Sequence, residues 1–131
     1  MIETGIYKAL IADPTVNAMV AGRVFYQAMP ENTPYPAVVF FIVTSDSEFT
    51  LDGPEGLTAR RFQFDAYANE AFAARRLIEA VRDVIEGIGA LPDGTTIQSA
   101  IHIMDGDLPL EIGAGGFAYR SMLDIELAYQ T

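Results

Sequence analysis

The sequence predicts an α+β fold: a mainly antiparallel sheet of two long hairpins packed against one long helix, with short helices at the N-terminus. The period of the apolar residues is the first observation, because helical spacing recurs over residues 1–12 and 69–86, whereas alternation recurs over 57–67 and 117–129. Length is the second, since 131 residues suffice for one substantial core but not for two. We therefore expect a single domain over residues 1–131.

The N-terminal region predicts two short helices, one brief strand and a connector. Residues 1–12 repeat apolar side chains at helical spacing. Asp13 and Pro14 then supply an N-cap and a first helical residue for the second helix. A strand at 24–26 follows, and the proline-rich stretch 29–36 has no periodicity, which predicts an exposed loop.

Residues 37–50 are rich in β-branched and aromatic side chains and predict one strand. Its first half is apolar on both faces, and a strand of that kind is normally covered on both faces. The long helix of a small domain covers only one of them. We expect another subunit to cover the face that carries Val39 and Phe41.

The hairpin that follows has an elaborate turn, "LDGPEGL", and two adjacent arginines on its second strand. Arg60 and Arg61 must point to opposite faces of the sheet, because neighbouring strand residues do so. Two interpretations stay open: both arginines are solvated near the hairpin tip, or one of them bonds an acidic patch on a neighbouring subunit. The predicted interface residues are Val39, Phe41, Leu51, Asp52, Gly53, Pro54, Glu55, Arg60 and Arg61.

The long helix begins at Asn69 or Glu70 and ends near Glu86, with an apolar stripe that faces the sheet. Strands at 96–104 and 117–129 form the last hairpin, and the glycine-rich "EIGAGG" lies between them. We expect the core between helix and sheet to contain six large side chains: Phe62, Phe64, Val81, Ile85, Leu123 and Ile125.

Composition excludes several classes of function. The chain carries 18 acidic and 8 basic side chains, a formal charge of -10, and such a surface repels nucleic-acid phosphate and anionic lipid. No apolar run approaches the roughly 20 residues that cross a bilayer, and the N-terminus lacks the pattern of a signal peptide. The absence of cysteine excludes disulfides and thiolate metal sites.

The sequence also lacks the motifs of an enzyme, so we expect neither catalysis nor a cofactor. His102 is the only histidine and has no partners at the spacing of a catalytic triad or a zinc site. Lys8 is the only lysine, which leaves no phosphate-binding loop, and no serine lies in a nucleophile elbow.

One segment leaves a second function open, a small-ligand or metal-binding module. "MDGDLPLE" brings together Asp105, Asp107 and Glu111, which suggests a calcium loop. Only the Asp-Gly-Asp core of that motif is present, and the other interpretation is a solvated hairpin end.

Several segments, in order and spacing, resemble the tail-completion family of tailed phages and prophages, which contains tail-terminator and head-to-tail joining proteins. They are the "ADP" helix start, the "GRVF" strand, the "PYPAVVF" strand entry, the "LDGPEGL" turn, the "FQFDAYA" strand before an arginine-bearing helix, and the closing strand "FAYRSMLDIELAY". The resemblance covers nearly the whole chain and is weakest in "HIMDGDLPLE".

This resemblance implies a structural role in the virion, with assembly in the host cytoplasm. The expected product is a homo-oligomeric ring, typically a hexamer, that ends the tail tube and binds the tube protein and the head connector or stopper. A head-side stopper or another connector layer is an alternative within the same neighbourhood. The family has no catalytic residues to transfer, and the "DGPEGL" hairpin becomes an arm that contacts a neighbour or the tube.

A ring on the tail axis must let DNA pass without binding it specifically. We therefore expect carboxylates to line the channel, either near Asp46 and Glu48 or near Asp105, Asp107 and Glu111. The alternative is a charge that is spread over the outside and serves solubility.

Overall fold

The computed structural model of the chain describes residues 1–43, 49–51, 57–113 and 116–130. It contains three helices, α1 (Ile2–Ala12), α2 (Pro14–Val20) and α3 (Ala71–Gly87). The strands are β1 (Val24–Tyr26), β2 (Ala37–Ile42), β3 (Phe49–Leu51), β4 (Leu57–Ala68), β5 (Thr96–Gly113) and β6 (Gly116–Gln130).

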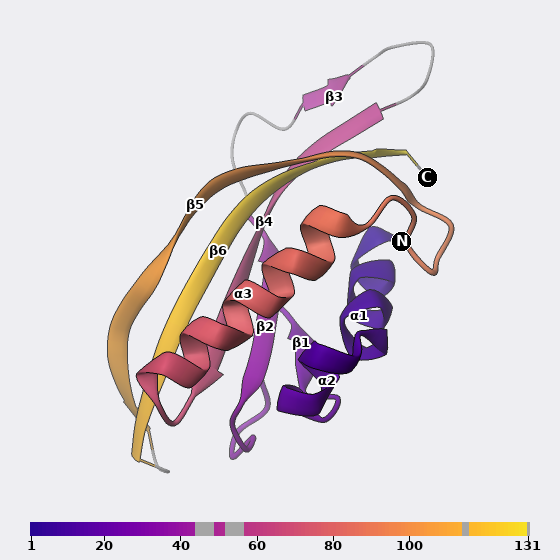
Figure 1. Ribbon diagram of the computed structural model, residues 1–131. Coiled ribbons are helices and arrows are strands. Elements are labelled where there is room, and N and C mark those ends of the chain that lie inside the picture. The colour runs from indigo at the N-terminus through magenta and orange to yellow at the C-terminus, as the bar shows by residue number, and fades with distance from the viewer. Residues whose placement is uncertain (44–48, 52–56, 114–115, 131) are drawn as a thin grey trace.

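The strands form one sheet in the order β1-β2-β4-β6-β5, and β3 pairs with the start of β4. Only β1 and β2 are parallel; the other described pairs are antiparallel. All three helices lie on the same side of the sheet (Figure 1). The predicted α+β class and the predicted layering are therefore confirmed.

The helix boundaries follow local signals in the sequence. Asp13 caps α2, because its carboxylate accepts a hydrogen bond of 3.0 Å from the backbone N–H of Val16. Ala21 ends α2 in the left-handed conformation, with φ of 48°. Glu70, one of the two predicted starts, is the N-cap of α3. Within the described residues, none of the helices combines the length and the apolar composition that a membrane span requires.

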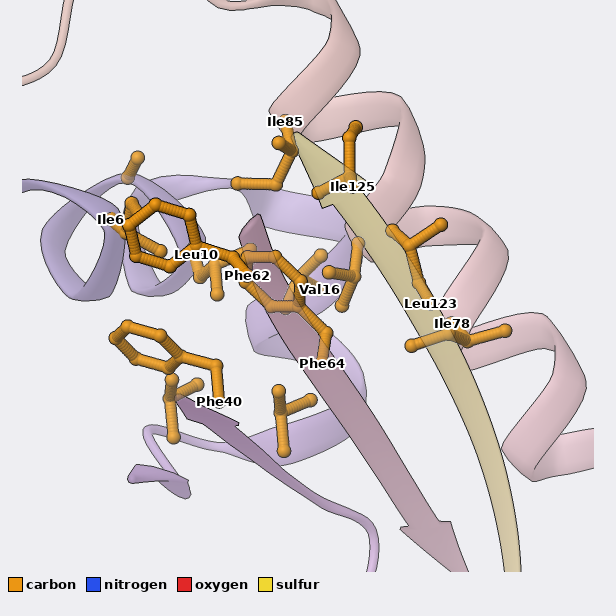
Figure 2. Close-up of a cluster of buried hydrophobic side chains, with 14 of the residues drawn as sticks. Ile6, Leu10, Val16, Phe40, Phe62, Phe64, Ile78, Ile85, Leu123 and Ile125 are labelled. Carbon is orange, nitrogen blue, oxygen red and sulfur yellow. The ribbon is translucent and has the colours of Figure 1, made fainter. Parts of the chain in front are cut away.

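The core lies between the helices and the sheet, and all six predicted core residues are buried. Figure 2 shows five of them, Phe62, Phe64, Ile85, Leu123 and Ile125, packing with residues of α1, α2 and β2, and Val81 belongs to the same cluster. The rings of Phe40 and Phe64 stack at a centroid distance of 5.6 Å across the β2–β4 pair.

The predicted strand 37–50 is wrong as one continuous element. β2 ends at Ile42 and β3 begins at Phe49, while the intervening residues 44–48 lie outside the described part of the chain. The sequence "TSDSE" between them contains Asp46 and Glu48, which are residue types that strands disfavour.

The predicted strand 96–104 is too short, because β5 continues to Gly113. Asp105 and Asp107 therefore lie within a strand and not in a solvated hairpin end. Aspartate has a poor strand propensity. Both aspartates can nevertheless continue the pairing with β6, because their carboxylates accept hydrogen bonds from neighbouring elements.

Candidate assembly interface

The face of the sheet opposite the helices has a polar centre. Because Phe62 and Phe64 point to the core, the alternate residues of β4 point away from it. These residues are Arg61, Gln63, Asp65 and Tyr67. The sequence alternation of β4 predicted this arrangement.

Arg61 forms an ion pair with Asp124 of β6 within its own chain. The guanidinium makes two contacts with the carboxylate, of which the one from Nε to Oδ1 is 3.3 Å long. The side chain of Asp124 is only 4% exposed, whereas that of Arg61 is 38% exposed. The hydrogen bond to Asp124, followed by the attraction of its charge, raises the pKa of Arg61. Arg61 is therefore already paired within its own chain.

Further polar contacts cross the same face. Gln63 donates a hydrogen bond of 2.9 Å from Nε2 to Asp65. Tyr67 stacks on Tyr35 of the connector, with ring centroids 5.9 Å apart, and accepts a hydrogen bond of 3.2 Å from Arg120. The connector thus packs one aromatic ring on this face of the sheet.

Asp105 joins the edge strand β5 to helix α3. Its carboxylate accepts hydrogen bonds from Arg75 at 3.1 Å and from Arg82 at 3.3 Å, and contacts His102 Nε2 at 2.8 Å. The hydrogen bond from His102, then that from Arg75, lowers the pKa of Asp105, and burial opposes them only partly. The charge of Asp105 is compensated inside the subunit.

These contacts argue against the metal-binding alternative. Asp105 is bound by two guanidinium groups, and Asp107 accepts a hydrogen bond of 2.7 Å from Ser121. Glu111 lies in β5, but its side chain falls outside the described part of the molecule. Among the residues that the structure does describe, no group of His, Cys, Asp and Glu is arranged to hold a metal ion.

An open groove lies between α2 and α3 on the helical side. Its volume is about 390 Å³, and its lining includes Asp13, Met19, Arg76 and Asp83. Half of its eight lining residues are exposed, and charged side chains stand beside apolar ones. This open groove of mixed charged and apolar character differs from the concave, mostly apolar pockets that bind small substrates.

A family model described as "Tail completion protein gp17" matches residues 4–108, most of the chain. The chain belongs to this tail completion family. Its role is that of a structural protein of the phage-type tail, located in the virion. The family resemblance in the sequence is therefore confirmed, although the match ends within β5.

Solved structures share the fold of this tail completion family member. It is similar to a chain of the "Virion of native gene transfer agent (GTA) particle", with a TM-score of 0.72 and 16% identity over 98% of this chain and 94% of that chain. It is also similar to the gp17 protein of bacteriophage SPP1, with a TM-score of 0.53 and 13% identity over 96% of this chain and 86% of that chain. No protein of curated function matches in sequence.

The predicted interface residues of this family member occupy different environments. Val39 is already buried in the single subunit, whereas Phe41 is partly exposed. Arg60 is partly exposed and has no described ion pair, in contrast to Arg61. Leu51 ends β3, and Asp52, Gly53, Pro54 and Glu55 lie outside the described residues. Their role in assembly stays a prediction.

Sequence reasoning missed two features of the tail completion fold: the ionic contacts of Asp105 and the exposed edge of β5. Arg75 and Arg82 are about two helical turns apart on the side of α3 that meets β5, but the pairing with Asp105 spans 30 and 23 residues of sequence. No local pattern encodes a contact of that separation. The exposed edge had a signal, since "AIHIM" places apolar residues on both sides of the strand.

Proposed function

We propose that the chain assembles into a homo-oligomeric ring, a hexamer, that ends the tail tube and joins it to the head connector. The family match over residues 4–108 carries this proposal. The similarity to a chain of a gene transfer agent virion supports it, because that chain is a component of an assembled particle. We propose that the protein works by assembly, without catalysis and without a cofactor.

The shape of the subunit is consistent with this role. β3 and the first residues of β4 extend beyond the helices at one end of the sheet (Figure 1). An extended hairpin of this kind can contact a neighbouring subunit or the tube. Arg60, whose charge has no described partner within the subunit, is the residue of this hairpin that we expect to bond a neighbour.

The test is addition of the purified chain to tails that lack it. We expect electron microscopy to reveal one added ring at the head-proximal end of each tail, and treated tails to join connector-bearing heads. Gel filtration with light scattering, at high protein concentration and with the tails present, measures the oligomeric state.

Two outcomes would contradict the proposal. Binding to heads but not to tails would identify a head-side stopper or connector layer instead. A chain that stays monomeric in the presence of tails and leaves them uncapped would exclude a ring. A monomer in the absence of tails is compatible with the proposal, because the tail end can act as the template on which the ring closes.

A further inference from the structure

The outer edge of β5 is an unpaired strand edge in the single subunit. β5 is the last strand in the sheet order, and β6 pairs only with its inner edge. Its first residues are also bonded on the outer side, because Ile97 donates a backbone hydrogen bond of 2.9 Å to Gly89 and Thr96 bridges to Ala90. Beyond Ile97, no strand among the described residues pairs with this edge. Unpaired backbone groups of this kind are a template for another strand.

The open part of this edge is apolar. Ile101 is 55% exposed, Met104 is 52% exposed and Ile103 is 40% exposed. Edge strands that stay free in solution usually carry lysine, proline, charged side chains or β-bulges that prevent pairing. Residues 96–104 contain no Asp, Glu, Lys, Arg or Pro, and bulges interrupt them only at residues 98 and 103. The pairing of β5 with β6 is irregular at residues 98 and 103, so the stretch Ser99–His102 between them is regular. This stretch is long enough to pair with a short strand of another molecule.

The charge distribution favours a second copy of this chain as the partner. Two subunits that each carry a charge of -10 repel one another over most of their surfaces. The edge from Ser99 to Met104 has no acidic side chain, and the next residue, Asp105, is compensated by Arg75 and Arg82. Two acidic subunits can therefore approach here with little like-charge repulsion.

The directions of the strands make the opposite edge of the sheet a suitable partner for the outer edge of β5. That edge consists of β1 and, at the other end of the sheet, β3. The pairing directions make both β1 and β3 antiparallel to β5. If the sheet of one subunit continues into that of the next in the same order, β5 of one copy meets β1 or β3 of the other, and the new pair is antiparallel, the more stable kind.

We propose that the outer edge of β5, at Ser99–His102, pairs with the β1 or β3 edge of an adjacent copy and continues the sheet from subunit to subunit. This inference rests on the proposed ring and specifies the contact between its subunits. The contact is heterologous, since each copy contributes a different edge, and contacts of this type generate rings when the rotation closes.

The first test places lysines on the edge. We expect the variant Ile101→Lys/Met104→Lys to keep the unfolding midpoint of the unaltered protein, because both side chains are exposed, and to cap at least about tenfold fewer tails. The matched control is Tyr7→Lys/Phe72→Lys, which adds the same charge at exposed apolar residues of α1 and α3. Normal capping by the edge variant overturns the proposal, and so does an equal loss in the control.

The second test identifies the partner and does not depend on the stability of the lysine variant. The chain has no cysteine, so Ser99→Cys provides a single site for a thiol-linked benzophenone on capped tails. We expect a cross-link to residues 24–26 or 49–51 of another copy, and none from Ala18→Cys on α2. A cross-link to the tube protein, a cross-link between two β5 strands, or no intermolecular cross-link overturns the proposal.

The two proposals fail in different ways. If the unaltered chain does not cap tails, the proposed function fails. If it does cap tails and the edge variant caps them equally well, only the β5 contact fails.

Discussion

Two adjacent arginines of β4 differ in their ion pairs, so we expect their substitutions to change the stability of the protein by different amounts. Arg61 pairs with Asp124, whose carboxylate is buried, whereas Arg60 has no described ion pair. Arg61→Ser leaves a buried carboxylate without its cation, and we expect a clear loss in the free energy of unfolding. Arg60→Ser is the control, with a change within about 0.5 kcal/mol in urea unfolding. Equal stability of the two variants would show that the ion pair contributes nothing.

Two glycines in helices predict changes of opposite sign. A Cβ atom at Gly5 of α1 would lie 2.5 Å from Asp93 Oδ1, whereas one at Gly87 of α3 meets no atom within 4 Å. Asp93 cannot move freely, because it accepts hydrogen bonds from Thr95 through N–H and hydroxyl at 3.0 and 2.9 Å. Glycine to alanine normally stabilises a helix by roughly 0.5–1 kcal/mol.

We therefore expect Gly87→Ala to raise the melting temperature and Gly5→Ala to lower it, as measured by circular dichroism. An increase for both variants would show that the loop of Asp93 yields without cost. This close approach has no signal in the sequence, where Gly5 looks like a weak point of an amphipathic helix.

At the scale of elements, the sequence predicted every helix, and it predicted the strands where apolar residues alternate. α3 and β4 are the clearest cases, since a stripe at helical spacing and an alternating run specify both the element and its buried face. The predictions failed where polar residues continue or interrupt a strand. β5 extends through Asp105 because arginines of α3 pair with it, and these contacts are distant in sequence.

The candidate interface was predictable only in part, for a similar reason. The position of Arg61 on the helix-free face follows from strand alternation. Its partner, Asp124, lies 63 residues away, so the sequence could not decide between an internal and an intersubunit ion pair.

The contact between α3 and β5 predicts a loss of stability in acid. The pKa of Asp105 is lowered in the folded state, so the contribution of its carboxylate is present above the unfolded-state value of about 3.9 and is lost as the pH falls through the lower folded value. We expect Asp105→Asn to lose on the order of 1 kcal/mol at pH 7 and progressively less in acid. Urea unfolding between pH 7 and about pH 2.5 measures this.

The exposed Asp83 of α3 provides the matched control, since Asp83→Asn removes the same charge where no described ion pair exists. A constant difference between Asp105→Asn and the unaltered protein over the whole pH range would contradict the assignment to this carboxylate.

For the whole molecule, the position of the negative charge limits which residues can line a channel. Asp105 pairs with Arg75 and Arg82 of its own subunit, whereas the exposed Asp107 accepts one hydrogen bond from the neutral Ser121 and keeps a charge that no described cation compensates. Asp46 and Glu48, the other predicted source, lie outside the described residues, as does the side chain of Glu111. An acidic channel lining therefore stays a prediction, and a structure of the assembled ring with the carboxylates facing outward would contradict it.

The net charge itself predicts how the protein behaves toward DNA. Proteins bind the duplex nonspecifically because cationic side chains release counterions from phosphate, and this chain has 8 basic against 18 acidic residues. Of the seven arginines, Arg61, Arg75 and Arg82 are paired with carboxylates of their own subunit. We expect fluorescence anisotropy to detect no binding of a short labelled duplex at physiological salt, up to on the order of 100 µM protein, which is the weak end of nonspecific affinity.

The variant Glu79→Lys/Asp83→Lys/Glu86→Lys places three cations on the exposed side of α3. It should bind the duplex at low salt and so control for the sensitivity of the assay. Saturable binding by the unaltered chain at physiological salt would show that the protein binds duplex DNA. That result would contradict the expectation of a channel through which DNA passes without being bound.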